Sequence, residues 1–170
     1  MRYMVIPVKK IICGGQAGAD LGALLAAREF GLESGGFAPK GWLTENGSQE
    51  ALLRSFGLIE SKEDGYPART RHNVANSDGT LLLGQYHAGG SRLTYEVAYE
   101  LSKPLFLVTC ANPPDMKPDE LRVEEFRQWL ENHQIQTLNV AGNRESELPG
   151  IAEFTRTFLA NALGRIRDHE

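Results

Sequence analysis

Short apolar runs alternate with helical patterns along the chain, and this alternation constrains the fold more than any other feature. Four runs have the composition of buried strands: Lys10–Cys13, Gly79–Gln85, Pro104–Thr109 and Ile135–Val140. Between the first two runs, apolar residues recur at helical spacing within Ala19–Phe30. Continuous apolar strands separated by helices are typical of a parallel sheet covered on both faces. We therefore predict an α/β fold, a single Rossmann-like three-layer α/β/α domain over residues 1–170 with a mostly parallel sheet of about five strands.

The remaining segments carry weaker signals. Residues 35–42 are consistent with a second strand and a loop. Residues 43–66 are polar and rich in turn residues, so we expect a surface excursion with one short helix at Gln49–Phe56, serving as a lid or an interface. Apolar spacing predicts further helices at Ala68–Asn76, after the Gly89–Gly90 pair, at Pro118–Leu130 and from Ile151 onward.

Composition and charge argue against several classes of protein. The chain has 170 residues, of which 41% are hydrophobic and 24% charged, as is ordinary for a globular protein. A net charge of −4 argues against non-specific nucleic-acid binding, and no stretch is apolar for long enough to cross a membrane. Cys13 and Cys110 each end a predicted strand, so we expect reduced thiols in a cytoplasmic protein. The histidines and cysteines form no metal-ligand pattern, and we predict no metal site.

Three glycine-containing loops follow predicted strands and lead toward helices: GGQAGAD at 14–20, AGGSRLTYE at 88–96 and AGNRESELPG at 141–150. In an open α/β sheet such loops emerge at the carboxyl edge, where ligands bind. Helix N-termini there present unpaired N–H groups that suit phosphate, and glycine lets an anion approach the backbone. Each loop alone is equally consistent with a tight turn. Together they predict a site for a small phosphorylated, nucleotide-like ligand at this edge.

The first two loops supply most of the candidate ligand-binding residues: Gly14, Gly15, Gln16, Gly18 and Asp20, then Gly89, Gly90, Ser91 and Thr94. Asp20 lies in the first turn of its helix, where it complements the helix dipole or caps the turn. Because a carboxylate repels phosphate, the alternative for Asp20 is a contact with a ligand hydroxyl or amine.

Two basic residues are predicted at the same edge. Lys40 follows the second strand, where it either reaches a phosphate as a point charge or lies exposed on the surface. Arg144 lies in the last loop, where it forms either a two-pronged contact with an anion or an ion pair with Glu145 or Glu147.

A polar stripe and one carboxylate complete the candidates. Arg69, His72, Asn73 and Asn76 fall at i, i+3, i+4 and i+7 of a predicted helix. This stripe is either a solvated face or a pocket wall in which Arg69 and Asn73 supply hydrogen bonds. Glu96 lies one turn into the helix after GGSRLT, where it is either an ordinary surface residue, a general acid or base, or a ligand for a ribose hydroxyl.

Six segments resemble, in order, one known family: KIICGGQAGAD, APKGW, ARTRHNVANSDGTLLL, GGSRLTYEVA, KPLFLV and LNVAGNRESELPGI. This is the molybdenum carrier family, the circularly permuted YpsA branch of the SLOG superfamily, and the resemblance extends from Lys10 to the last helix. It implies a Rossmann-like fold with a pocket for a pterin-phosphate or nucleotide-like ligand. It favours a carrier of the molybdenum cofactor (molybdopterin) over an enzyme, and a homodimer as the assembly.

The same superfamily contains lysine-decarboxylase-like phosphoribohydrolases, which carry a PGGxGTxxE motif. Here AGGSRLTYE keeps the glycine pair and places Glu96 at the matching spacing, but Ala88, Arg92 and Leu93 depart from that motif. The resemblance therefore leaves a second hypothesis open, a nucleoside 5′-monophosphate phosphoribohydrolase with Glu96 as the catalytic residue and Arg69 or Arg92 in support. A nucleotide sensor without chemistry is a third.

Overall fold

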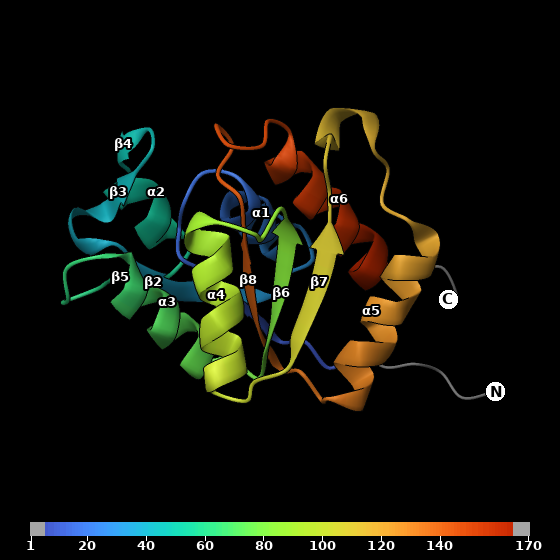
Figure 1. The fold of residues 1–170 in the computed structure, drawn as a ribbon. Coiled ribbons are helices and arrows are strands. Elements are labelled where there is room, and N and C mark those ends of the chain that lie inside the picture. The colour runs from blue at the N-terminus through green and yellow to red at the C-terminus, as the bar shows by residue number, and fades with distance from the viewer. Residues whose placement is uncertain (1–5, 165–170) are drawn as a thin grey trace.

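The structure, a computed structural model, describes residues 6–164 and contains a parallel sheet in the order β5–β2–β1–β8–β6–β7 (Figure 1). The strands of this sheet are β1 (Lys10–Ile12), β2 (Glu33–Ala38), β5 (Leu58–Glu60), β6 (Gly79–Gly84), β7 (Leu105–Thr109) and β8 (Thr137–Gly142). Each neighbouring pair is parallel. The α/β prediction is confirmed, with a 6-stranded sheet in the described residues instead of about five strands.

Helices cover both faces of this sheet (Figure 1). One face carries α1 (Ala19–Glu29), α5 (Glu120–Asn132) and α6 (Ile151–Gly164), and the opposite face carries α3 (Tyr66–Ala75) and α4 (Gly89–Glu100). β8 comes last in the chain but lies between β1 and β6, so it joins the N-terminal half of the sheet to the other half.

The larger core lies between the sheet and the α1–α5–α6 layer. Leu81 and Leu83 of β6 and Leu138 and Val140 of β8 are fully or almost fully buried in it. Phe126 of α5 is also buried, and aromatic rings lie around it at centroid distances of 5.2 to 5.8 Å: Phe106, Trp129 and Phe158. Burial of this apolar surface supplies the main force that holds the layers together.

The segment predicted as a surface excursion is more structured than expected. It contains a 3₁₀ turn, η1 (Lys40–Trp42), a two-stranded hairpin of β3 (Leu43–Thr44) and β4 (Gly47–Ser48), α2 (Glu50–Ser55) and β5. α2 agrees with the predicted helix at Gln49–Phe56, but β5 joins the sheet beside β2 and was missed. Only Leu58 of its three residues is buried, so an edge strand of this length leaves no apolar run to recognise.

Capping residues explain the shifted helix boundaries. The side chain of Asp119 accepts a hydrogen bond from the Leu121 amide at 3.0 Å, so α5 begins at Glu120 and not at Pro118. Tyr66 begins α3 two residues earlier than predicted, because Pro67 occupies the first turn, where its missing N–H costs nothing.

The packing of α1 against α6 leads to a stability prediction. A Cβ added at Gly22 would lie 2.1 Å from the carbonyl oxygen of Ala152 in α6, so Gly22→Ala must push the two helices apart. We expect the free energy of unfolding to fall by about 1–3 kcal/mol in urea titrations, despite the better helix propensity of alanine.

The matched control is Gly90→Ala, at a helical position where a Cβ meets open space. This control should be neutral or stabilising by up to about 1 kcal/mol. Equal effects of the two substitutions would contradict tight contact between α1 and α6.

Candidate functional site

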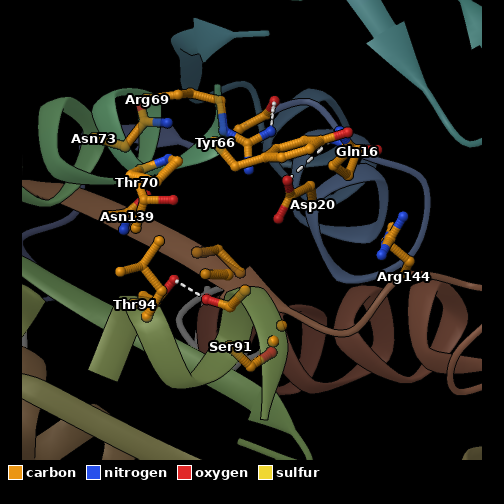
Figure 2. Close-up of a pocket in the computed structure, with 18 of the residues that line it drawn as sticks. Gln16, Asp20, Tyr66, Arg69, Thr70, Asn73, Ser91, Thr94, Asn139 and Arg144 are labelled. Atoms are coloured by element: carbon orange, nitrogen blue, oxygen red, sulfur yellow. Dashed lines mark hydrogen bonds between the residues drawn. The ribbon is translucent and has the colours of Figure 1, made fainter. Parts of the chain in front are cut away.

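A cavity of about 240 Å³ opens at the carboxyl edge of the sheet (Figure 2). The β1–α1 loop, the end of β8, one side of α3 and the first turns of α4 line it. This is the position at which open α/β sheets bind ligands.

The cavity brings together ten of the candidate residues: Gly14, Gln16, Asp20, Arg69, Asn73, Gly89, Gly90, Ser91, Thr94 and Arg144. Side chains from α3 and α4 face each other across it, with Asp20 between them (Figure 2). Four further candidates do not line it: Gly15, Gly18, Lys40 and Glu96.

Two of these four residues have structural reasons to be glycine. Gly15 has a φ of +76°, and an added Cβ would lie 2.8 Å from Leu58. Gly18 has a φ of +103° and lies against the backbone of the last loop, where a Cβ would be 2.4 Å from the carbonyl oxygen of Asn143. Both glycines therefore permit left-handed backbone and close packing.

The other two lie outside the cavity with ion-pair partners. Lys40 is exposed in η1 and pairs with Asp64 at 3.3 Å. Glu96 points from the exposed side of α4 and pairs with Arg92 at 2.9 Å. The structure therefore separates these two charges from the ten candidates in the cavity.

Two backbone amides of the β1–α1 region already have partners within the protein. The Gln16 amide donates to Asp20 Oδ2 at 3.0 Å, and the Ala19 amide donates to the carbonyl oxygen of Asn143 at 3.2 Å. The loop therefore presents a carboxylate to the cavity, where the sequence suggested bare N–H groups for phosphate. Burial raises the pKa of Asp20 from its ordinary 3.8 to about 6, although nearby Arg69 and the loop amides act in the opposite direction.

Arg69 of α3 lies against the same loop. Its Nη1 donates to the carbonyl oxygen of Gly14 at 3.2 Å, and an added Cβ at Gly14 would lie 2.8 Å from the guanidinium carbon. The Nε of Arg69 is buried without a hydrogen-bond partner, and the ring of Tyr66 lies 5.0 Å from the guanidinium carbon. Burial lowers the pKa of Arg69, and Asp20 opposes this effect.

Whereas the first turn of α1 contains Asp20, the first turn of α4 contains no acidic residue. No side chain caps it, and the N–H groups of the first turn of a helix have no partner within the helix. Gly89, Gly90 and Ser91 line the cavity here, while Thr94 donates back to the Gly90 carbonyl at 3.0 Å. This turn is the part of the cavity best suited to an anion.

Arg144 lies at the cavity (Figure 2), and its ion-pair partner Glu147 also lines it. Its Nε contacts Glu147 Oε1 at 3.0 Å, which is one of the ion pairs considered from the sequence. The pair is about half exposed, so its electrostatic contribution to stability is small. An anion in the cavity can therefore compete for this guanidinium at low cost.

Asn73 lines the cavity, but its side-chain amide is already hydrogen-bonded to the backbone of β2. Its Oδ1 accepts from the Phe37 amide at 2.9 Å, and its Nδ2 donates to the Phe37 carbonyl at 3.3 Å. Asn73 therefore ties α3 to β2, and these two bonds use the atoms expected to contact a ligand.

Sequence reasoning missed several lining residues: Tyr66, Pro67, Thr70, Leu93, Asn139, Val140, Ala141, Gly142 and Glu147. Part of this set had a recognisable signal. Tyr66, Arg69, Thr70 and Asn73 fall at i, i+3, i+4 and i+7, which is the cavity-facing stripe of α3. The predicted stripe included His72, whose ring instead packs on Phe37 at 5.2 Å.

Comparison with known proteins agrees with this architecture. Residues 11–163 match the family described as circularly permutated YpsA SLOG. The chain belongs to this family. The crystal structure of a putative molybdenum carrier protein from Syntrophus aciditrophicus SB is similar, with 35% identity, a TM-score of 0.81, and coverage of 92% of this chain and 96% of that one. A search among proteins with curated functions finds no match.

Membership of the circularly permutated YpsA SLOG family confirms the resemblance seen in the ordered motifs. Within residues 6–164, no helix is both long and apolar enough to span a membrane. The same residues contain no cluster of three or more histidine, cysteine or acidic side chains arranged to hold a metal ion.

The raised pKa of Asp20 predicts a pH-dependent stability difference. A raised acid pKa means that ionised Asp20 destabilises the folded state, so this cost appears as the pH rises from 3.8 to about 6. Asp20→Asn has no such cost. The variant should therefore gain stability relative to the wild type across this range, by at most about 3 kcal/mol, with no further gain above pH 7.

Urea titrations of both proteins between pH 4 and 8 measure this difference. A constant difference over the whole range would show that Asp20 has the same pKa in the folded and unfolded states. The exposed Glu100→Gln on α4 serves as the control, because its carboxylate pairs only at the surface with Arg71.

Proposed function

We propose that the protein binds a small phosphorylated heterocyclic molecule, of the pterin or nucleotide kind, and carries it without transforming it. The observation that carries the proposal is the uncapped first turn of α4, which opens into a cavity that Arg144 also lines. Helix N–H groups without partners in the helix favour a phosphate group here, and the half-exposed Arg144 can exchange its pair with Glu147 for one with the phosphate.

Charge distribution decides where the phosphate would bind. Asp20 is buried in the β1–α1 loop and would repel a phosphate there. Gly89 and Gly90 have open space around their Cα atoms, so an anion can approach the backbone of α4 closely. We therefore assign the phosphate to α4 and Arg144, and the rest of the ligand to the side of the cavity near Asp20.

The size of the cavity favours a small ligand. Its volume of about 240 Å³ is below the range of about 300–1,000 Å³ that is usual for drug-sized ligands. A mononucleotide or a singly phosphorylated pterin suits such a space better than a dinucleotide. The molybdenum cofactor is a phosphorylated pterin, and the name of the Syntrophus protein points to such a cargo. In that cargo the pterin dithiolene holds the metal, so a carrier needs no metal ligands of its own.

The position of Glu96 favours a carrier over a phosphoribohydrolase. The hydrolase hypothesis requires this carboxylate to reach a ribose in the cavity, but Glu96 pairs with Arg92 on the exposed side of α4. A general acid or base must lie within hydrogen-bonding reach of the reacting atoms. Of the two supporting arginines considered, only Arg69 lines the cavity.

A charge introduced at Gly90 tests the phosphate position. Its side chain would enter open space, so neither Gly90→Asp nor Gly90→Asn needs to disturb the fold. Aspartate stabilises a helix N-terminus but repels phosphate. We expect ribose 5-phosphate to bind Gly90→Asp about tenfold or more weakly than Gly90→Asn in calorimetric titrations, while the melting temperature of unliganded Gly90→Asp equals or exceeds that of the wild type. Equal affinities for the two variants would place the phosphate elsewhere.

Retention of cargo tests the carrier role. The protein should co-elute in gel filtration with added molybdopterin, followed by pterin fluorescence and molybdenum content, and should release no free base from AMP or GMP. Glu96→Gln should leave retention unchanged, because Glu96 lies outside the cavity. Base release that Glu96→Gln abolishes would establish the hydrolase instead.

A further inference from the structure

Two buried side chains that line the cavity contain hydrogen-bond acceptors without a complete set of donors. Gln16 and Asp20 are only 8% and 7% exposed, and both line the cavity. The Nε2 of Gln16 donates to the Leu43 carbonyl at 3.2 Å, which fixes the orientation of the amide. Its Oε1 is then buried with no partner. Such an atom carries a desolvation cost that a donor from a ligand would relieve.

Asp20 adds a charged acceptor beside this amide. One of its oxygens accepts from the backbone N–H of Gln16, and a carboxylate has about four acceptor positions in all. The carboxylate points into the cavity between Tyr66 and the first turn of α4 (Figure 2). No ion pair joins it to Arg69 in the described part of the chain. The carboxylate therefore interacts with amides of its own loop and keeps acceptor positions for a ligand.

Arg69 supplies the opposite polarity in the same part of the cavity. Its Nη1 bonds the Gly14 carbonyl, but its Nε is buried and unpaired. The guanidinium is close enough to Asp20 for each to shift the pKa of the other. Gln16, Asp20 and Arg69 together form one polar wall of the cavity. This wall offers one donor and two acceptors, and each of the three side chains has hydrogen-bonding capacity that the protein does not use.

Guanine and pterin rings share one edge that complements this wall. Along it lie a ring carbonyl, a ring N–H and an exocyclic amino group, in the order acceptor, donor, donor. We propose that Arg69, Asp20 and Gln16 recognise this 2-amino-4-oxopyrimidine edge and select guanine-like or pterin-like rings. The inference rests on the proposed function, since it assumes that the phosphate of the ligand lies at α4.

Adenine presents the wrong polarity to the same groups. Its amino group would face the donor Arg69, and the lone pair of its ring nitrogen would face the carboxylate of Asp20. A site built to pair buried polar groups rejects a ligand that leaves them unpaired, by factors of up to about 10⁴–10⁵. The ring of Tyr66 lines the same cavity, 5.0 Å from the guanidinium carbon of Arg69, and provides a flat wall for either heterocycle.

Nucleotide affinities measured at pH 7.5 test the inference. The wild type should bind GMP about 100-fold or more tightly than AMP, and about tenfold or more tightly than IMP, which lacks only the amino group. Neopterin monophosphate should compete with GMP for the same site. A pterin that binds more tightly than GMP would identify the ring as a pterin, and the reverse order would identify a guanine nucleotide.

Asp20→Asn provides a change of specificity that structural damage cannot imitate. In this variant the asparagine Oδ1 can still accept from the backbone N–H of Gln16. The asparagine Nδ2, a donor, then faces the ligand. Adenine carries a ring-nitrogen lone pair where guanine carries the ring N–H, so the variant should bind AMP more tightly and GMP more weakly than the wild type does. Glu100→Gln, which removes an exposed carboxylate from the same protein, should keep the wild-type order.

The outcomes separate this inference from the proposed function. Binding of ribose 5-phosphate with equal affinities for GMP and AMP would overturn the inference and leave the proposed function intact. An unchanged preference for GMP in Asp20→Asn would exclude Asp20 from recognition and overturn it as well. Failure of ribose 5-phosphate, of every nucleotide and of neopterin monophosphate to bind would overturn both.

Discussion

Parallel pairing of β8 between β1 and β6 is the constraint on which the site depends. Ile11 pairs with Leu138, and Leu81 pairs with Val140, so three strands distant in the sequence end at one edge. The close fit extends to the end of β8, where a Cβ at Gly142 would lie 2.4 Å from the Leu83 carbonyl oxygen. Because the strands end together, the loops that follow them converge on one cavity.

Periodicity predicted the parts of the fold that bury continuous apolar surface. β6 is buried along its whole length, and its prediction was correct to one residue. β5 was missed because only Leu58 of this edge strand is buried. The ends of α3 and α5 were displaced because Pro67 and Asp119 set them through local geometry, which the spacing of apolar residues does not report.

The edge of the sheet that holds the site could be predicted, but the direction of each side chain could not. Gly15 and Gly18 looked like phosphate contacts, yet their positive φ values and close neighbours serve the loop itself. Glu96 occupies the spacing of a catalytic motif, yet the helix turns it outward to Arg92. Motif spacing places a residue on an element, whereas helix rotation and competing partners decide where its side chain points.

The cavity is lined by buried polar groups that lower the stability of the folded protein. Each buried group without a partner costs stability, and burial of the Asp20 carboxylate adds an electrostatic cost. These costs fall on Gln16, Asp20 and Arg69, while Arg144, which also lines the cavity, is half exposed and paired. A ligand that satisfies the wall would gain specificity from it, and its phosphate would meet a more hydrated and exchangeable contact. Such a division, with selection at the buried end and easy exchange at the open end, suits a protein that must both choose a cargo and release it.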